Sequence, residues 1–100
     1  MGAVADFAEL PMDRWSSALS AVARAGVTLD DEGVDRGMHV YVCRHDRSEV
    51  VLMFGHVLPG VDQGVCMYSP VRSWWRRPLE MRRVSRVVWS AVLASGGRTV

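Results

Sequence analysis

The stretch Glu49–Leu58, EVVLMFGHVL, decides the fold of this protein. Successive side chains of a strand point to opposite faces of a sheet. Here both sets are mainly apolar, with Val50, Leu52, Phe54 and His56 on one face and Val51, Met53 and Val57 on the other. A sheet with one face in water alternates apolar with polar residues instead. We therefore expect a central strand that is covered on both faces.

Shorter apolar runs on either side of this stretch predict three further strands. They cover Val27–Leu29, Met38–Cys43 and Val65–Tyr68. Turn-forming residues separate the runs, including Asp30–Gly33 and Pro59-Gly60. The connections are short, which favours an antiparallel meander.

Two amphipathic helices are predicted outside the strands. Asp13 caps the first, which runs to about Ala25 and ends at Gly26. Pro78 fits the first turn of the second, which runs to about Ser95 and ends at Gly96-Gly97. Residues at helical spacing in the two segments are expected to form much of the core: Trp15, Leu19, Val22, Val84, Val88 and Val92.

The predicted fold class is α+β, a four-stranded antiparallel meander sheet with an N-terminal and a C-terminal helix packed on one face of it (α-β-β-β-β-α). One domain would span residues 1–100, since 100 residues leave no room for a second core. Residues 1–11 are expected to form a short extra helix or an arm, and residues 96–100 a frayed tail.

Composition favours a cytoplasmic protein. Hydrophobic residues make up 49% of the chain, yet no stretch approaches the length of a membrane helix. The first ten residues carry Asp6 and Glu9 where a secretory signal would be basic. Two cysteines, Cys43 and Cys66, are too few for a disulfide framework. All 12 basic residues are arginine, which suggests a GC-rich bacterial genome.

Charge is unevenly distributed along the chain. Residues 1–62 carry a net charge of −5 and residues 63–100 a net charge of +6. Six arginines fall between Arg72 and Arg86, together with Trp74 and Trp75. Guanidinium groups pair with phosphates and tryptophan stacks on bases, so a nucleic-acid partner is one interpretation. The pI of 7.9 is low for a dedicated nucleic-acid binder, and the alternative is pairing with acids of the first half.

A protein partner is the interpretation that we favour for this segment. Trp and Arg are enriched among the residues that dominate binding energies at interfaces. The outer face of the second helix is predicted to continue the same surface. The candidate partner-binding residues are Trp74, Trp75, Arg76, Arg77, Arg82, Arg86, Trp89 and Leu93.

A small-molecule cleft on the sheet is a second candidate site. Five residues with polar or thiol groups could share one sheet face: His39, Tyr41, Cys43, Cys66 and Tyr68. The Cys and His spacing does not give the two close pairs of a zinc site, so neither a metal nor another cofactor is expected. No catalytic residues are predicted, because neither cysteine lies in a nucleophile motif and phosphate-binding loops are missing.

The sequence thus predicts a small non-enzymatic protein-interaction module, with the ligand cleft and the nucleic-acid interface as alternatives. Its partner would be a second copy, in a homodimer, or another protein. The reason is that the chain has more apolar strand and helix surface than two helices and one sheet can bury among themselves.

Overall fold

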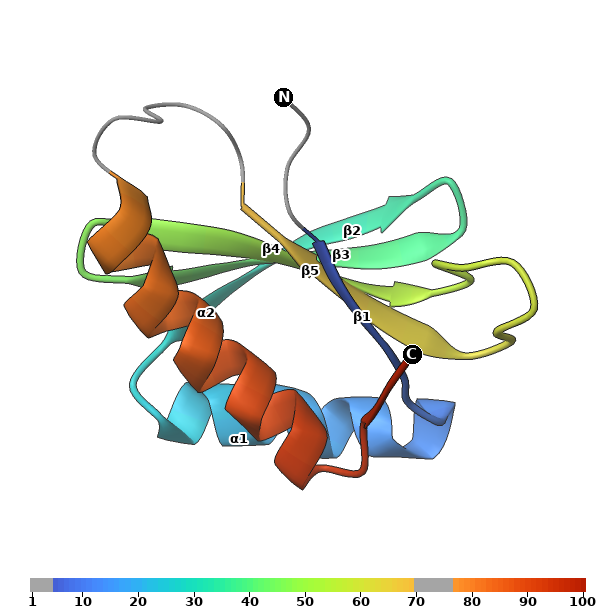
Figure 1. Ribbon diagram of the computed structural model, residues 1–100. Coiled ribbons are helices and arrows are strands. Elements are labelled where there is room, and N and C mark those ends of the chain that lie inside the picture. Colours follow the sequence, from blue (N-terminus) through green and yellow to red (C-terminus); the bar gives the residue numbers. More distant parts are fainter. Residues whose placement is uncertain (1–4, 70–76) are drawn as a thin grey trace.

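The computed structural model describes residues 5–69 and 77–100, and the side chains of residues 6–69 and 83–100 among them. It is an α+β fold in which two helices pack on a six-stranded antiparallel sheet (Figure 1). The strands lie in the order β2-β3-β4-β5-β1-β6. Their bounds are β1 Ala5–Glu9, β2 Thr28–Asp35, β3 Met38–His45, β4 Ser48–Gly55, β5 Gly64–Tyr68 and β6 Arg98–Thr99.

The predicted meander is present as β2 to β5, but the sheet has two more strands than expected. Ala5–Glu9, expected as a helix or an arm, pairs with β5 as strand β1. Arg98 and Thr99, expected to fray, pair with β1 as strand β6. Both additions join segments far apart in sequence, which local patterns do not report.

Strand β2 is also longer than predicted, because Asp30–Gly33 forms no turn. This acidic segment continues along β3, with a register shift between Asp31 and Gly33. Such a β-bulge lets the strand carry one extra residue. At the other end of the meander, β4 stops at Gly55, three residues before the predicted end.

Helix α1 spans Trp15–Arg24 and follows a short 3₁₀ turn, η1, at Met12–Arg14. Asp13 lies inside this turn, so the N-cap of α1 is Arg14 and not Asp13 as predicted. Helix α2 spans Arg77–Ala94. Both end as predicted at glycine: Gly26 and Gly96 have positive φ. Val27 N–H donates to Val22 O and Gly97 N–H to Val92 O, the wide hydrogen bond of a Schellman motif.

Both helices lie on the same side of the sheet, as predicted (Figure 1). Helix α2 contacts β3 and β4, and α1 packs against α2 and β2. The core between them includes Val22, Val84, Val88 and Val92, all at most 1% exposed, with Trp15 and Leu19 packed partly buried against it. Neither described helix combines the length and apolar character that a membrane crossing requires.

Candidate functional site

The sheet has two apolar faces, and the described helices cover one. The covered face carries Val50, Leu52 and Phe54 of β4, which are 0–1% exposed and belong to the main core. Cys43 lies opposite Val50, and Val65 lies opposite Phe54, so they share this face. We call it the helix face.

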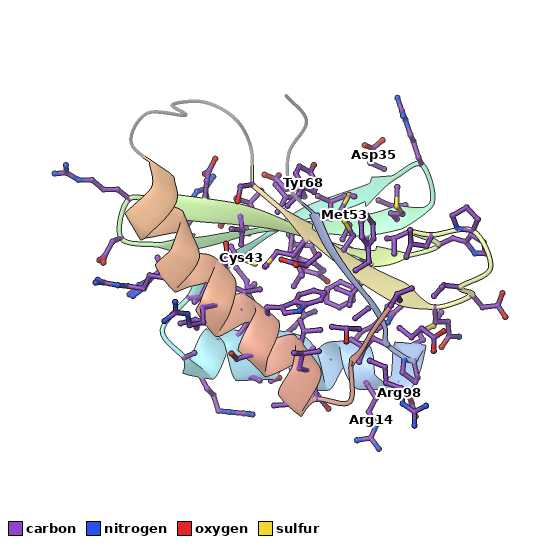
Figure 2. All side chains as sticks on the ribbon, in the orientation of Figure 1. Arg14, Asp35, Cys43, Met53, Tyr68 and Arg98 are labelled. Carbon is purple, nitrogen blue, oxygen red and sulfur yellow. The ribbon has the colours of Figure 1, made fainter. Side chains whose placement is uncertain are left out.

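The opposite side is formed by the residues between these positions, and we call it the outer face. The strand register places Asp30, Asp35, Arg44 and Glu49 on it, together with seven largely apolar side chains: Phe7, Val40, Val42, Val51, Met53, Cys66 and Tyr68. Figure 2 shows Met53 and Tyr68 on the side of the sheet away from the helices, and Cys43 beneath it. Val51 and Cys66 are 8% and 4% exposed but lie outside the main core, and the other five of these seven side chains are half-buried.

Within residues 5–69 and 77–100, no helix or strand packs on the outer face. The prediction that both faces of the central strand are covered is confirmed for the helix face, and the outer face has no covering element among the described residues. The sequence analysis did not propose the outer-face residues as a site, although the alternating apolar pattern of β4 indicates that Val51 and Met53 share a face. Phe7 gave no such indication, because β1 was not expected to be a strand.

The predicted cleft residues do not share a face. His39, Tyr41 and Cys43 lie on the helix face, whereas Cys66 and Tyr68 lie on the outer face. The alternation of side chains within each strand was predicted correctly. However, β3 and β5 do not pair directly, and their relative register depends on how each pairs with β4, which the sequence pattern of one strand does not show. The five residues therefore do not line a common cleft.

His39 and Tyr41 instead belong to a series of rings on the helix face. The imidazole stacks on Tyr41 with centroids 4.7 Å apart, and Tyr41 meets Phe54 edge-on at 5.9 Å. Phe54 in turn packs against Trp15 at 5.4 Å. Burial, and to a lesser degree the nearby Asp31 carboxylate, raises the pKa of Tyr41.

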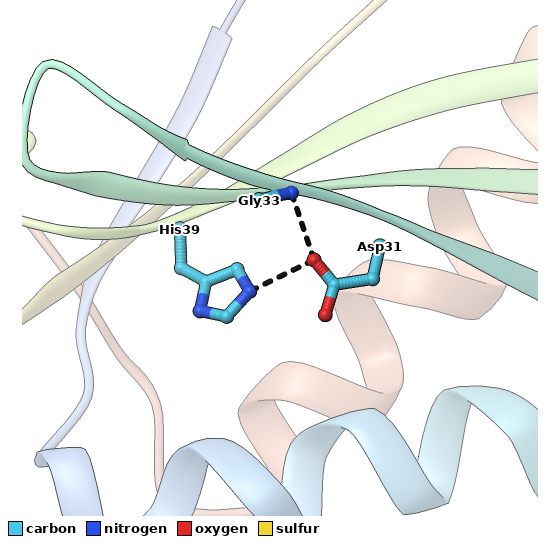
Figure 3. Close-up of polar contacts among 3 residues, drawn as sticks. All are labelled: Asp31, Gly33 and His39. Carbon is cyan, nitrogen blue, oxygen red and sulfur yellow. Dashed lines mark hydrogen bonds and ion pairs between the residues drawn. The ribbon is translucent and has the colours of Figure 1, made fainter.

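Asp31 fixes the exposed end of this series (Figure 3). Its Oδ1 accepts a hydrogen bond from Gly33 N–H at 2.8 Å and lies 2.9 Å from His39 Nε2. The hydrogen bond from Gly33, followed by the one from His39, lowers the pKa of the Asp31 carboxyl. The pair thus spans the bulge of β2 and ties it to β3.

This arrangement does not assemble a nucleophilic site. The thiol on the same face of β3, Cys43, is fully buried, and burial raises its pKa to about 12. It is therefore protonated at neutral pH and is a poor nucleophile. Burial also raises the pKa of Cys66 on the outer face, with a smaller contribution from Asp6. Among the described residues, no three His, Cys, Asp or Glu side chains gather closely enough to hold a metal ion.

Part of the predicted partner surface lies outside the described residues, namely Trp74, Trp75 and Arg76. Arg77 and Arg82 belong to α2, but their side chains lie outside the described set as well. Arg86 is exposed and Leu93 is 39% exposed, consistent with positions on the outer side of the helix.

Trp89 differs from its predicted position on the outer side of α2. It is half-buried and packs against the core. Helix α2 touches both the sheet and α1, so its buried arc is wider than one stripe. A large indole next to Val88 can reach into this arc.

Comparison of the chain with protein-family models, with curated proteins and with solved structures finds no match.

Proposed function

We propose that this protein is a small interaction module that forms a homodimer through its outer face. The observation that carries the proposal is the apolar character of that face, centred on Val51, Met53 and Cys66, without a described element packed on it. Val51 and Cys66 at its centre are 8% and 4% exposed and Met53 is half-buried, so the proposal depends on the apolar character of the face and not on a large exposed area.

A second copy suits this surface because the face is flat and made of strands. Two such faces can pack about 10 Å apart, as in β-sandwiches, with their side chains interdigitating. The seven residues lie on four strands; at a spacing of about 4.8 Å and about five residues a strand, these give a flat patch of about 300 Å². This flat area is below the lower limit of about 600 Å² per partner for stable interfaces.

Charges at the rim do not oppose this packing strongly. Arg44, at the end of β3, forms ion pairs with Asp30 on β2 and with Glu49 on β4. One guanidinium and two carboxylates leave a net charge of −1 at this corner of the face. They also hold the three strands together where the patch ends.

Pairing through the sheet edge is disfavoured by contrast. Edge strand β2 carries Asp30, Asp31, Glu32 and Asp35 in addition to its bulge. Charged side chains and bulges are the devices that keep exposed edges from pairing with other chains. Association through the β2 edge is thus disfavoured, which leaves the face of the sheet and the β6 edge.

The test is the molar mass in solution, measured by sedimentation equilibrium over a wide range of concentration. The wild-type protein is expected at twice its chain mass of 11.1 kDa. Met53→Arg places a charge in the centre of the patch and is expected to give 11.1 kDa while keeping a native circular dichroism spectrum.

Val34→Asp is the matched control, because Val34 is 70% exposed and belongs to the other side of edge strand β2. It should remain dimeric. A wild-type chain that stays monomeric at every concentration would overturn the proposal, and so would a Met53→Arg variant that dimerises normally.

A further inference from the structure

A cleft of about 760 Å³ lies where three separate segments of the chain meet. One wall is the connection from β1 to α1, the second is the loop before β5, and the third is the end of α2 with the start of β6. Its volume falls in the range typical of small-molecule sites. It includes none of the seven outer-face residues named above and none of the predicted cleft residues, although the register places Glu9 and Arg98 on the outer side of the sheet.

The first two walls are bound to each other by hydrogen bonds. Leu10 N–H donates to the Gln63 carbonyl at 3.1 Å, and Met12 N–H donates to Gln63 Oε1 at 2.6 Å. Trp15 Nε1–H donates to the Leu10 carbonyl at 2.8 Å. Leu10 and Val61 are 0% and 8% exposed, so apolar packing supports the lining. The cleft is therefore preformed.

Gly96 and Gly97 form the tight turn at the end of α2, in the third wall of the cleft. A Cβ built on Gly97 would lie 2.9 Å from the Val92 carbonyl oxygen, which leaves no room for a side chain. Gly96 has φ +107° and faces Arg14, whose Cγ lies 4.0 Å from the position of a Cβ. Because of this tight turn, Arg98 lies at the cleft only a few residues after the end of α2.

Four charged residues are among those that line the cleft, and all four are exposed: Arg14, Arg98, Glu9 and Asp62. Figure 2 shows Arg14 and Arg98 at the same end of the molecule. In the part of the chain that the structure describes, none of these four groups has an oppositely charged partner within 4.0 Å. This holds although Glu9 and Arg98 are directly opposite in the β1–β6 pair.

We propose that the cleft binds a small zwitterion, an α-amino acid or a short peptide with free ends. The guanidinium groups of Arg14 and Arg98 would hold its carboxylate, because the planar fork matches two carboxylate oxygens. The carboxylates of Glu9 and Asp62 would hold its ammonium group. A simple anion would be repelled by the two acids, and a simple cation by the two arginines.

The test is a titration of ¹⁵N-labelled protein followed by NMR. The probes are the free amino acids and glycylglycine, compared with N-acetylated amino acids, amino-acid amides and inorganic phosphate. At least one free zwitterion is expected to shift the amide signals of Leu10, Gln63 and Gly97 saturably, and the blocked compounds and phosphate are expected not to.

Variants assign the binding to the charged groups. Arg98→Gln and Asp62→Asn should each weaken binding about tenfold, the loss of about 1.4 kcal/mol. Arg24→Gln is the control, since Arg24 is exposed at the other end of α1. The unfolding midpoints of all three variants should stay close to that of the wild type.

The proposal is overturned if no probe binds saturably, if blocked compounds or phosphate bind as well as zwitterions, or if Arg24→Gln weakens binding equally. The Met53→Arg variant should retain the binding, so the outcome is separable from that of the dimer experiment.

Discussion

The two faces of the sheet have similar amino-acid chemistry but different surroundings. On β4, Leu52 faces the helices and is fully buried, while its neighbour Met53 lies on the outer face and is half-buried. Both are large and apolar. The alternating pattern of the sequence predicts which residues share a face of the sheet. Which face is covered depends on the number and position of the helices.

Two helices suffice for one face of this sheet. Helices pack about 10 Å apart, so two side by side cover about 20 Å. Six strands at about 4.8 Å spacing span a similar or slightly larger width. Because α1 and α2 both lie on one side, the outer face has to rely on something else for its cover.

Truncating adjacent residues of β4 compares the two faces most directly. Leu52→Ala leaves a cavity in the helix-face core and is expected to lower the free energy of unfolding by about 2–5 kcal/mol. Met53→Ala should lower it by less than about 1 kcal/mol in dilute solution, where the monomer prevails. Urea denaturation at low protein concentration measures both. Equal losses would mean that the outer face is packed as a second core.

The two cysteines provide a chemical comparison of the same faces. Cys43 has a pKa raised by burial to about 12, so a thiolate-specific alkylating reagent should modify Cys66 first at mildly alkaline pH. Mass spectrometry of digested protein locates the modification. In denaturant both thiols should react at the same rate, and faster labelling of Cys43 in the folded protein would contradict the assignment.

The pKa of Cys43 also has a consequence for stability. Because the folded-state pKa is raised, the contribution of the protonated thiol is complete below about pH 9 and is lost as the pH rises toward about 12. A Cys43→Ser control removes the thiol titration. Its stability should therefore fall less steeply across this range than that of the wild type.

The smallest expected effect concerns the polar end of the helix face. The folded-state pKa of Asp31 is lowered, so its contribution to stability is present above its ordinary value of 3.8 and disappears as the pH falls through the folded value. Asp31→Asn should slightly lower the melting temperature near neutral pH and have no such effect in strong acid. Asp35→Asn, which removes a carboxylate from the same strand, is the control.

Some of the fold followed directly from local patterns. The apolar stripes and the glycines Gly26 and Gly96 located the helices to within a few residues, because helix periodicity and chain termination are local properties. The same holds for the alternation of β3 and β4. By contrast, Asp30–Asp31 resembled a turn and became part of β2, since pairing with β3 outweighed its low strand propensity.

The candidate sites were less accessible to sequence reasoning. The apolar excess of the chain predicts an interaction surface, and the residues predicted to form it, Trp74 to Leu93, combine a Trp- and Arg-rich segment with one face of the second helix. No local sequence pattern predicted the cleft proposed to bind a zwitterion. Its charged groups, among them Arg14, Asp62 and Arg98, come from three segments that only the folded chain brings together.

The sequence by itself determined the α+β class, both helices and the apolar character of both sheet faces, because each depends on the spacing of residues within one segment. Only the tertiary structure decided that β1 and β6 complete the sheet, that Cys43 and Cys66 face opposite sides, and that both helices pack on the same face. These features depend on contacts between distant segments, whose register is set by the connections and by packing and not by any local pattern.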